Sequence, residues 1–277
     1  MILVGRHATT YQKADMTQRA DNQQKKVAIV TGATAGLGKA IAIRLAQEGV
    51  FVVATGRNQA AGAALIESIQ SSGGQGAFVA ADIEDAGQAM GLANHVVDAF
   101  GKVDILVASA GAPPAAQGVI GQVEPNAIAD QVARTVRIKL NPVHAVVPHM
   151  TERGSGSILF VTSEGGRFPT PGQTTVAIHS GGLIMAAKVM AKELSRSQVR
   201  VNTLCVTLVE DTPVYERFAG GELTAIRQKV FDKIASQAPF GLAKPYEIAS
   251  VATFLVSGAA SHITGATLSA TGGATYS

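Results

Sequence analysis

The stretch Thr31-Gly32-Ala33-Thr34-Ala35-Gly36-Leu37-Gly38 decides the fold, because its three glycines stand between an apolar strand and a helix. Glycine lets a ligand approach the backbone closely, and a helix N-terminus offers free N–H groups to a pyrophosphate. The spacing alone also fits a tight strand–helix turn that binds nothing. With its strand and helix, the stretch predicts a dinucleotide site whose contacts are Gly32, Thr34, Gly36, Leu37 and Gly38.

Apolar segments of strand length alternate with helical segments along the rest of the chain. Their continuous Val, Ile and Ala content indicates burial on both faces, which is typical of a parallel sheet. Repeated strand–helix alternation indicates right-handed crossovers and a doubly wound α/β fold in a single domain. The expected strands cover residues 27–30, 50–55, 76–81, 105–109, 157–162, 199–206 and 267–269, and the helices begin near residues 38, 58, 85, 126, 175 and 245.

Two segments stand apart from this Rossmann-type domain, which we expect to span residues 26–277. Residues 1–25 are polar and contain no apolar core of a secretory signal, so we expect a flexible N-terminal extension. Residues 207–240 have mixed polarity and contain the pair Gly220-Gly221. An excursion of that length predicts a substrate loop or lid.

The composition narrows the class of partner. The chain has 277 residues, of which 47% are hydrophobic and 16% charged, and a formal net charge of +3 without a basic run. Nucleic-acid binding is therefore not favoured, and the absence of an apolar stretch of about 18 residues predicts no membrane span. One cysteine, Cys205, excludes an intramolecular disulfide and fits a reducing, cytoplasmic location. We expect a small-molecule partner and no metal site.

The ends of the second and third strands bear on the choice of cofactor. NAD-binding folds place an acid after the second strand, where it accepts from a ribose hydroxyl. This chain has Gly56 and then Arg57, whose guanidinium suits a 2′-phosphate and predicts NADP(H) rather than NAD(H). A solvated arginine at a strand end is the alternative. Asp82, followed by Ile83, either accepts from the adenine amino group or caps the next helix.

Together these residues resemble the short-chain dehydrogenase/reductase family over about residues 25–275. Ala108-Ser109-Ala110-Gly111 is similar to the family's Asn-Asn-Ala-Gly segment, which implies that Ala110 and Gly111 border the cofactor. Ser163 looks like the family's catalytic serine, and residues 244–249 and 254–257 look like its C-terminal helix. The resemblance implies a seven-stranded parallel sheet and a homotetramer or homodimer.

The resemblance breaks at three of the four catalytic positions. Counting thirteen residues on from Ser163 places Val176 at the family's tyrosine, and four more place Ser180 at its lysine. Counting thirteen back from Pro148 places Thr135 at its asparagine. No tyrosine occurs between Tyr11 and Tyr215, so a small shift of the alignment does not restore the motif.

Several residues are candidates to replace the lost groups. His179 lies three residues after Val176, on the same helix face, and imidazole is the natural acid or base near neutral pH. Its alternative is packing between helices. Ser180 can donate to a nicotinamide ribose. Glu164 is either an acid/base or a solvated carboxylate, and Tyr215 is either a donor or a lid aromatic.

Two functions therefore remain open from the sequence. The first is an NADP(H)-dependent oxidoreductase with a non-standard active site, acting on a small carbonyl or alcohol. The second is a catalytically inactive relative that binds nucleotide or ligand. The fold does not decide between them.

Overall fold

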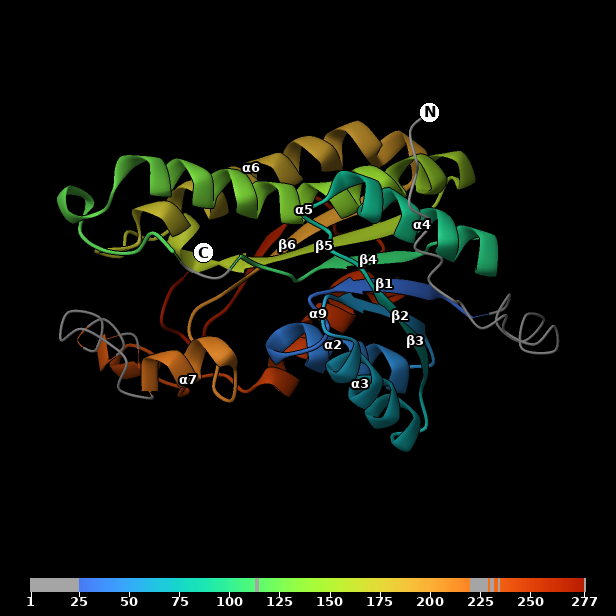
Figure 1. Ribbon diagram of the computed structural model, residues 1–277, viewed down its shortest axis with the longest axis horizontal. Helices are drawn as coiled ribbons and strands as arrows, with labels where there is room; N and C mark the ends of the chain where they lie inside the picture. The colour runs from blue at the N-terminus through green and yellow to red at the C-terminus, as the bar shows by residue number, and fades with distance from the viewer. Residues whose placement is uncertain (1–24, 113–114, 220–228, 230–231, 234, 277) are drawn as a thin grey trace, which may run out of the picture.

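The computed structural model describes residues 25–112, 115–219, 229, 232–233 and 235–276, so the expected N-terminal extension lies almost wholly outside the described residues. Seven parallel strands form one sheet in the order β3-β2-β1-β4-β5-β6-β7 (Figure 1). This confirms the predicted doubly wound α/β fold. The strands are β1 (Val27–Thr31), β2 (Phe51–Gly56), β3 (Gln75–Ala80), β4 (Ile105–Ala108), β5 (Gly156–Ser163), β6 (Val199–Val206) and β7 (Thr267–Ala270).

Helices cover both faces of the sheet (Figure 1). On one face lie α4 (Ala86–Phe100), α5 (Pro125–Arg153) and α6 (Thr174–Leu194), and on the other lie α2 (Gly36–Gln47), α3 (Gln59–Ser71) and α9 (Pro245–Val256). Successive strand residues feed opposite layers, as a pleat requires: Ile29 packs with the first layer and Val30 with the second. The sheet is therefore buried on both sides, which explains its continuous apolar strands.

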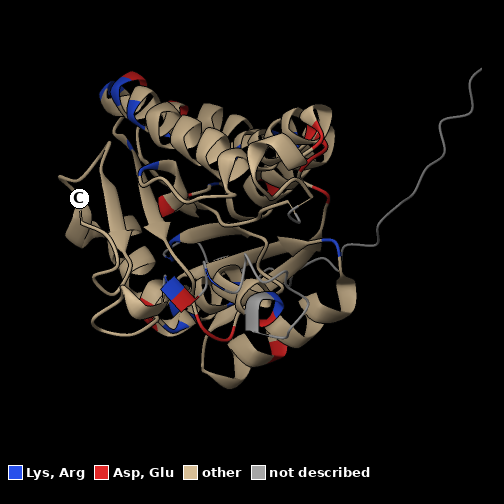
Figure 2. Ribbon diagram, turned by 90° about the vertical axis from the view of Figure 1, so that its left-hand side faces the viewer, with Lys and Arg blue, Asp and Glu red and all other residues tan. Residues whose placement is uncertain are grey.

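Charge is almost absent from the sheet and concentrates on helices and connections (Figure 2). Of the seven described strands, only β6 carries a charged residue, Arg200. Its guanidinium donates to the carbonyl oxygens of Leu255, Ser257 and Ile263, at 2.8, 3.0 and 3.1 Å. The bonds to Leu255 and Ser257 satisfy acceptors at the C-terminal end of α9, where a cation also matches the helix dipole.

Side-chain caps fix two of the helix starts near the predicted positions. Asn58 accepts from the Ala61 N–H at 3.0 Å at the start of α3, and Asp85 accepts from the Gln88 N–H at 2.8 Å at the start of α4. Each cap satisfies one of the N–H groups that a helix leaves without an internal partner.

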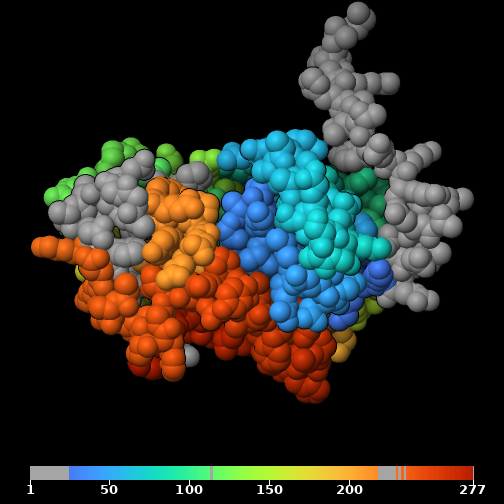
Figure 3. Space-filling view, turned by 90° about the horizontal axis from the view of Figure 1, so that it is seen from below, coloured from blue at the N-terminus to red at the C-terminus, as the bar shows by residue number. Residues whose placement is uncertain are grey.

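The predicted substrate loop, residues 207–240, contains a short helix, α7 (Pro213–Ala219), and a bridge from Val209 to Ala243. Figure 3 shows α7 beside the helices of the N-terminal half. A Cβ added at Gly36 would lie 3.3 Å from the Pro213 Cδ atom, so α7 begins against the glycine turn. Residues 220–228, 230–231 and 234 of the loop lie outside the described residues.

Four 3₁₀ turns complete the described structure. They are η1 (Ile120–Gln122), η2 (Glu164–Gly166), η3 (Ser195–Ser197) and η4 (Gly258–Ala260). The turn η2 directly follows β5 and packs against α6. It therefore lies at the carboxyl end of the sheet, where the candidate site is found.

One helical segment, Thr174–Ser197, is long and apolar enough to cross a membrane, with a mean hydropathy of 1.2. The sequence analysis expected no such stretch. The segment is α6 with its following turn, and its residues Leu183 and Ala187 belong to the apolar core against the sheet. Its composition is that of a helix in an α/β core.

Two helical glycines give opposite expectations for the same substitution. A Cβ at Gly62 in α3 would overlap the Phe78 ring, whereas a Cβ at Gly91 in α4 meets nothing within 4 Å. Gly91→Ala should stabilise the fold by about 0.5–1 kcal/mol through helix propensity. Gly62→Ala should destabilise it by about 1–3 kcal/mol through overpacking. Urea unfolding of both variants measures the difference, and a gain at Gly62 would contradict the packing described.

Candidate functional site

A cavity of about 1150 Å³ opens at the carboxyl ends of the strands. This is the edge where ligands bind in open α/β sheets. The cavity brings together all the predicted site residues except Ser180: Gly32, Thr34, Gly36, Leu37, Gly38, Arg57, Asp82, Ile83, Ala110, Gly111, Thr135, Ser163, Val176 and His179.

The glycine turn forms one end of this cavity. Gly32 has a φ of +64°, and a Cβ there would lie 2.6 Å from the Ala110 Cα atom. The start of α2 has no side-chain cap at Ala35 and no acidic residue in its first turn. Its N–H groups are therefore not satisfied by side chains and suit an anion, as a pyrophosphate requires.

A second contact joins the glycine turn to the end of β4. The Ala110 N–H donates to the Thr31 hydroxyl at 3.2 Å, and that hydroxyl donates to the Val107 carbonyl oxygen at 3.4 Å. These bonds tie the loops after β1 and β4 together. They hold Gly111, where a Cβ would meet nothing within 4 Å, at the cavity wall.

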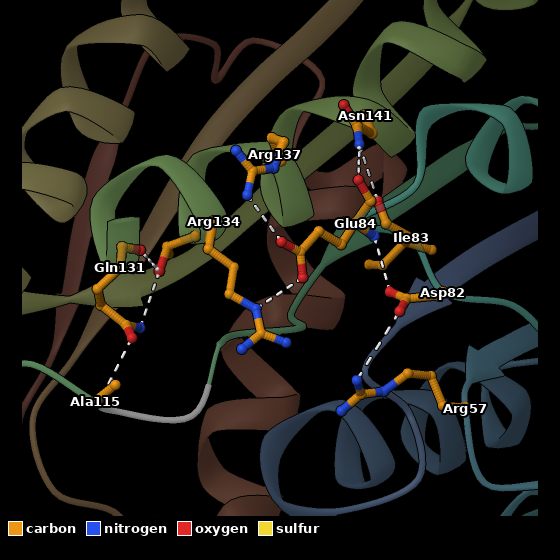
Figure 4. Close-up of polar contacts among 10 residues, drawn as sticks. Arg57, Asp82, Ile83, Glu84, Ala115, Gln131, Arg134, Arg137 and Asn141 are labelled. Atoms are coloured by element: carbon orange, nitrogen blue, oxygen red, sulfur yellow. Dashed lines mark hydrogen bonds and ion pairs between the residues drawn. The ribbon is translucent and has the colours of Figure 1, made fainter. Parts of the chain in front are cut away.

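Arg57 and Asp82 line the cavity at the same end as the glycine turn, because a Cβ at Gly56 would lie 3.1 Å from the Thr34 Cγ2 atom, and their side chains point toward each other (Figure 4). The Arg57 Nη1 and Asp82 Oδ2 atoms are 3.9 Å apart, and the two side chains are 62% and 40% exposed. An ion pair this long and exposed contributes little and leaves Arg57 available to a ligand. The sequence analysis gave helix capping as the alternative role of Asp82. The residue that caps α4 is Asp85.

Glu84 anchors α5 beside this end of the cavity (Figure 4). Its carboxylate accepts from Arg134 at 2.7 Å and from Arg137 at 3.0 Å. The hydrogen bonds from Arg137 and Arg134 hold the pKa of Glu84 below its usual value, although its burial acts the other way. The pairs fix the register of α5 against the loop after β3.

At the other end of the cavity, Ser163 closes β5. Its Oγ atom accepts from the Gly165 N–H at 3.1 Å, which fixes the oxygen and leaves its proton for another acceptor. Val176 borders the same turn, because a Cβ at Gly165 would lie 3.1 Å from the Val176 Cγ1 atom. Thr135 is buried, and its hydroxyl donates to the Gln131 carbonyl of its own helix at 2.9 Å.

His179 and Ser180 take part in a chain of side-chain hydrogen bonds. The Thr162 hydroxyl donates to the Ser180 Oγ atom at 3.0 Å, and Ser180 Oγ lies 3.2 Å from His179 Nδ1. The tautomer of the neutral His179 ring sets the direction of the second bond. The ring either accepts from Ser180 at Nδ1 and carries its proton on Nε2, or donates from Nδ1 to Ser180 and leaves Nε2 as an acceptor. Ser180 is fully buried behind the cavity wall.

Burial, and secondly the charge of Lys139, lowers the pKa of His179 to about 4. The ring is therefore neutral at neutral pH. A neutral imidazole donates a hydrogen bond but is a poor source of a full proton. His179 thus borders the cavity as a neutral ring with one N–H donor and one acceptor nitrogen.

Lys139 is the residue that the sequence analysis missed. It lies one turn after Thr135 on α5, is 4% exposed, and lines the cavity. Its Nζ atom donates to the carbonyl oxygens of Ala108 at 2.7 Å and Val161 at 2.6 Å. Burial lowers the pKa of Lys139 to about 7. The signal in the sequence was a lysine between Ile138 and Leu140 on the helix face of Thr135.

Glu164 is buried rather than solvated, at 3% exposure. Among the described residues its carboxylate has no hydrogen bond, and its Oε1 atom lies 3.6 Å from the Arg167 Nη1 atom. Burial, with a smaller contribution from the Glu164 charge, raises the pKa of the Cys205 thiol to about 12 and leaves it inert. Tyr215 lies on α7 but is not among the residues that line the cavity.

The family is established by comparison with known proteins. A family model described as short chain dehydrogenase matches residues 26–221. The chain belongs to the short-chain dehydrogenase family.

Similar proteins include the 3-oxoacyl-(acyl-carrier-protein) reductase FabG of Thermotoga maritima, 32% identical over 90% of this chain and 97% of that protein. The crystal structure of YwfH, an NADPH-dependent reductase involved in bacilysin biosynthesis, has a TM-score of 0.83 and 25% identity, over 92% of this chain and 100% of YwfH. The structure of a 7α-hydroxysteroid dehydrogenase in complex with NADH and 7-oxo glycochenodeoxycholic acid has a TM-score of 0.81 and 30% identity, over 92% of this chain and 96% of that dehydrogenase.

The depressed pKa of His179 predicts a pH dependence of stability. In the folded protein the pKa is about 4, below its ordinary value of 6.5, so the unfolded chain binds more protons between these values. Stability should therefore fall as pH drops from about 6.5 towards 4. Urea unfolding at pH 7.5 and 5 should show a smaller loss for His179→Gln than for the wild type.

His262→Gln is the matched control, because His262 is exposed. That variant should lose as much stability as the wild type over the same range. An imidazole NMR resonance of His179 that titrates near 6.5 would show that the ring is not desolvated as described.

Proposed function

We propose that this protein is an NADP(H)-dependent oxidoreductase acting on a small carbonyl or alcohol. The observation that carries the proposal is a single cavity that joins the uncapped N-terminus of α2 to the Ser163 hydroxyl. A nicotinamide cofactor, when bound there, supplies or accepts a hydride. Membership of the short-chain dehydrogenase family supports the same reaction class.

The residues at the α2 end fit such a cofactor. The free N–H groups of α2 would hold the pyrophosphate, and Arg57 would hold a 2′-phosphate through charge-assisted hydrogen bonds. Position 56 has little room for the acid that NAD-binding folds use, because a Cβ there would lie 3.1 Å from the Thr34 Cγ2 atom. Relatives with either cofactor occur among the similar structures, so the preference for NADP(H) rests on Arg57.

The residues at the Ser163 end fit a substrate oxygen. Ser163 has a free proton to donate, and the neutral His179 ring offers a second donor in the tautomer that carries its proton on Nε2. Val176 contributes an apolar wall without a proton. These groups orient the substrate oxygen. Their hydrogen bonds become stronger as that oxygen gains negative charge in the transition state, and this lowers the activation barrier.

Val176 and Ser180, which replace the tyrosine and lysine of the family, favour the second candidate, a relative that binds nucleotide without turnover.

One measurement distinguishes the two candidate functions. NADPH oxidation across a panel of ketones, enones and imines should reveal a substrate, and Ser163→Ala should lower that rate about 10–100-fold if the hydroxyl orients the oxygen. Tight NADPH binding with no oxidation of any panel member would favour the binding protein.

We also propose a homotetramer, or at least a homodimer, in the cytoplasm. The outer face of α6 exposes Ile178, Met185 and Val189, at 48%, 59% and 49%. Their spacing places them on one stripe of the helix, and such contiguous apolar faces support association. Phe254 on α9, on the other face of the sheet, and Leu268 on the edge strand β7 are also exposed and support a second interface.

The preference for NADP(H) should depend on Arg57. Arg57→Ala removes the only proposed partner of the 2′-phosphate, so affinity for NADPH should fall about 10–100-fold while affinity for NADH stays within a few-fold. Calorimetric titration of both cofactors measures the change. Arg44→Ala, which removes another exposed arginine paired with Glu48, should alter neither affinity. An Arg57→Ala protein that still prefers NADPH would remove the basis of the preference.

Association should depend on the α6 stripe. Met185→Glu places a charge in the centre of the stripe, and burying an unpaired charge in an interface costs several kcal/mol. The variant should therefore show a smaller mass by light scattering at micromolar concentration. Ile120→Glu, at an exposed apolar position on η1, is the control. A monomeric wild type would rule out the proposed assembly.

A further inference from the structure

We propose that Lys139 is the proton donor and acceptor of the active site, in place of the family's tyrosine and its partner lysine. This inference rests on the proposed oxidoreductase function. It places the reaction's titratable group on α5, whereas the tyrosine and lysine positions are on α6.

The geometry around the Lys139 amine leaves one bonding position open. Its Nζ atom donates to two carbonyl oxygens. One belongs to Ala108, the last residue of β4, and the other to Val161, near the end of β5. A neutral amine has two N–H bonds and an ammonium has three, so either form satisfies both carbonyls. Protonation then changes only the third position, which carries an N–H or a lone pair. The proton can leave or return without breaking a hydrogen bond to the protein.

This third position belongs to the site already described. Lys139 lines the same cavity as Ser163 and His179. Val161, one of its two acceptors, lies two residues before Ser163 on β5. The amine is therefore fixed to the same strand that carries the serine hydroxyl. Two short hydrogen bonds also restrict its motion, which a positioned acid or base requires.

The charges around Lys139 leave its proton exchangeable. The adjoining strands β4 and β5 contain no charged side chain, and α6 contributes His179. On η2, Glu164 lies next to Arg167 and does not form an ion pair with Lys139 among the described contacts. Within the part of the chain that the structure describes, no carboxylate therefore pairs with the ammonium, and burial lowers the pKa of Lys139 to about 7. His179, with a pKa of about 4, stays neutral beside it.

In the reducing direction NADPH bound in the cavity would give up a hydride and become NADP⁺. The hydride joins the carbonyl carbon, and the C=O π electrons move to oxygen. The oxygen takes a proton from the Lys139 ammonium, which becomes an amine, while Ser163 and His179 donate hydrogen bonds to the same oxygen. Water then returns a proton to the amine. Oxidation of the alcohol runs through the same groups in reverse, with the amine as the base.

Three variants separate this role from a structural one. Lys139→Met keeps the length and removes the proton, and Lys139→Arg keeps a charge that does not leave at neutral pH. Lys188→Met is the control, because Lys188 is an exposed lysine on α6. Single-turnover reduction by bound NADPH should fall about 100-fold or more in both Lys139 variants and not in the control. Calorimetric NADPH affinity should stay within a few-fold in all three.

The pH profile adds a signature that packing would not produce. Wild-type reduction should decline as pH rises through about 7, and the residual rate of Lys139→Met should lose that step. A readout independent of turnover is NMR of lysine side chains labelled with ¹³C at Cε. One resonance should titrate near 7, well below the ordinary lysine value of about 10. It should be absent from Lys139→Met, or be assigned by elimination if that variant does not fold.

The outcomes distinguish this inference from the proposed function. Recovery of the rate in Lys139→Arg, or the absence of any lysine resonance that titrates near 7, would overturn proton transfer by Lys139 and leave the proposal of an NADP(H) oxidoreductase intact. A wild type that binds no nicotinamide cofactor, or binds it and reduces nothing, would overturn the proposed function. The Lys139 resonance would then report only a buried amine, and the catalytic inference would fall with the function.

Discussion

The reversal of strand order between β1 and β4 is the constraint on which the rest of the structure depends. From β1 the chain leaves to α2 on one face, and from β4 it leaves to the helices on the other face. The two loops therefore diverge and open a crevice at the carboxyl ends. Gly32 against Ala110 forms its floor, and no larger residue fits there without moving the backbone. The start of α2 and the amine of Lys139 reach the same cavity from opposite faces of the sheet.

The missing lysine at position 180 and the buried lysine at position 139 belong to one electrostatic arrangement. The charge of Lys139 already lowers the pKa of His179, the neighbour of Ser180, so position 180 lies in the same field. A second ammonium there would repel the first without a carboxylate between them. Ser180 instead accepts from Thr162 and shares a second hydrogen bond with His179, which satisfies a fully buried position with neutral groups.

The fold could be predicted from the sequence because each signal lies within the element that it defines. Strands without charge, caps at Asn58 and Asp85, and the glycine turn each determine their own element, and the sheet order follows from right-handed crossovers. Lys139 was not predicted, because an analysis of hydrophobic periodicity assigns a lysine to the surface of a helix. Counting back from Pro148 also selects Thr135, which lies one turn away on the same helix face. The burial of Glu164 was not predicted for a related reason, since its neighbour Cys205 on β6 approaches it only in the folded protein.

A buried lysine and a tyrosine–lysine pair reach a pKa suitable for proton transfer in different ways. A tyrosine has an ordinary pKa of about 10 and needs a nearby cation to become a useful acid, so two residues act as a unit. Lys139 reaches a pKa of about 7 through burial alone. The same burial destabilises the ammonium form, and two carbonyl acceptors at 2.6 and 2.7 Å offset part of that cost. Its acidity therefore depends on the dryness of the α5–sheet contact, so packing remote from the reacting atoms tunes the proton transfer.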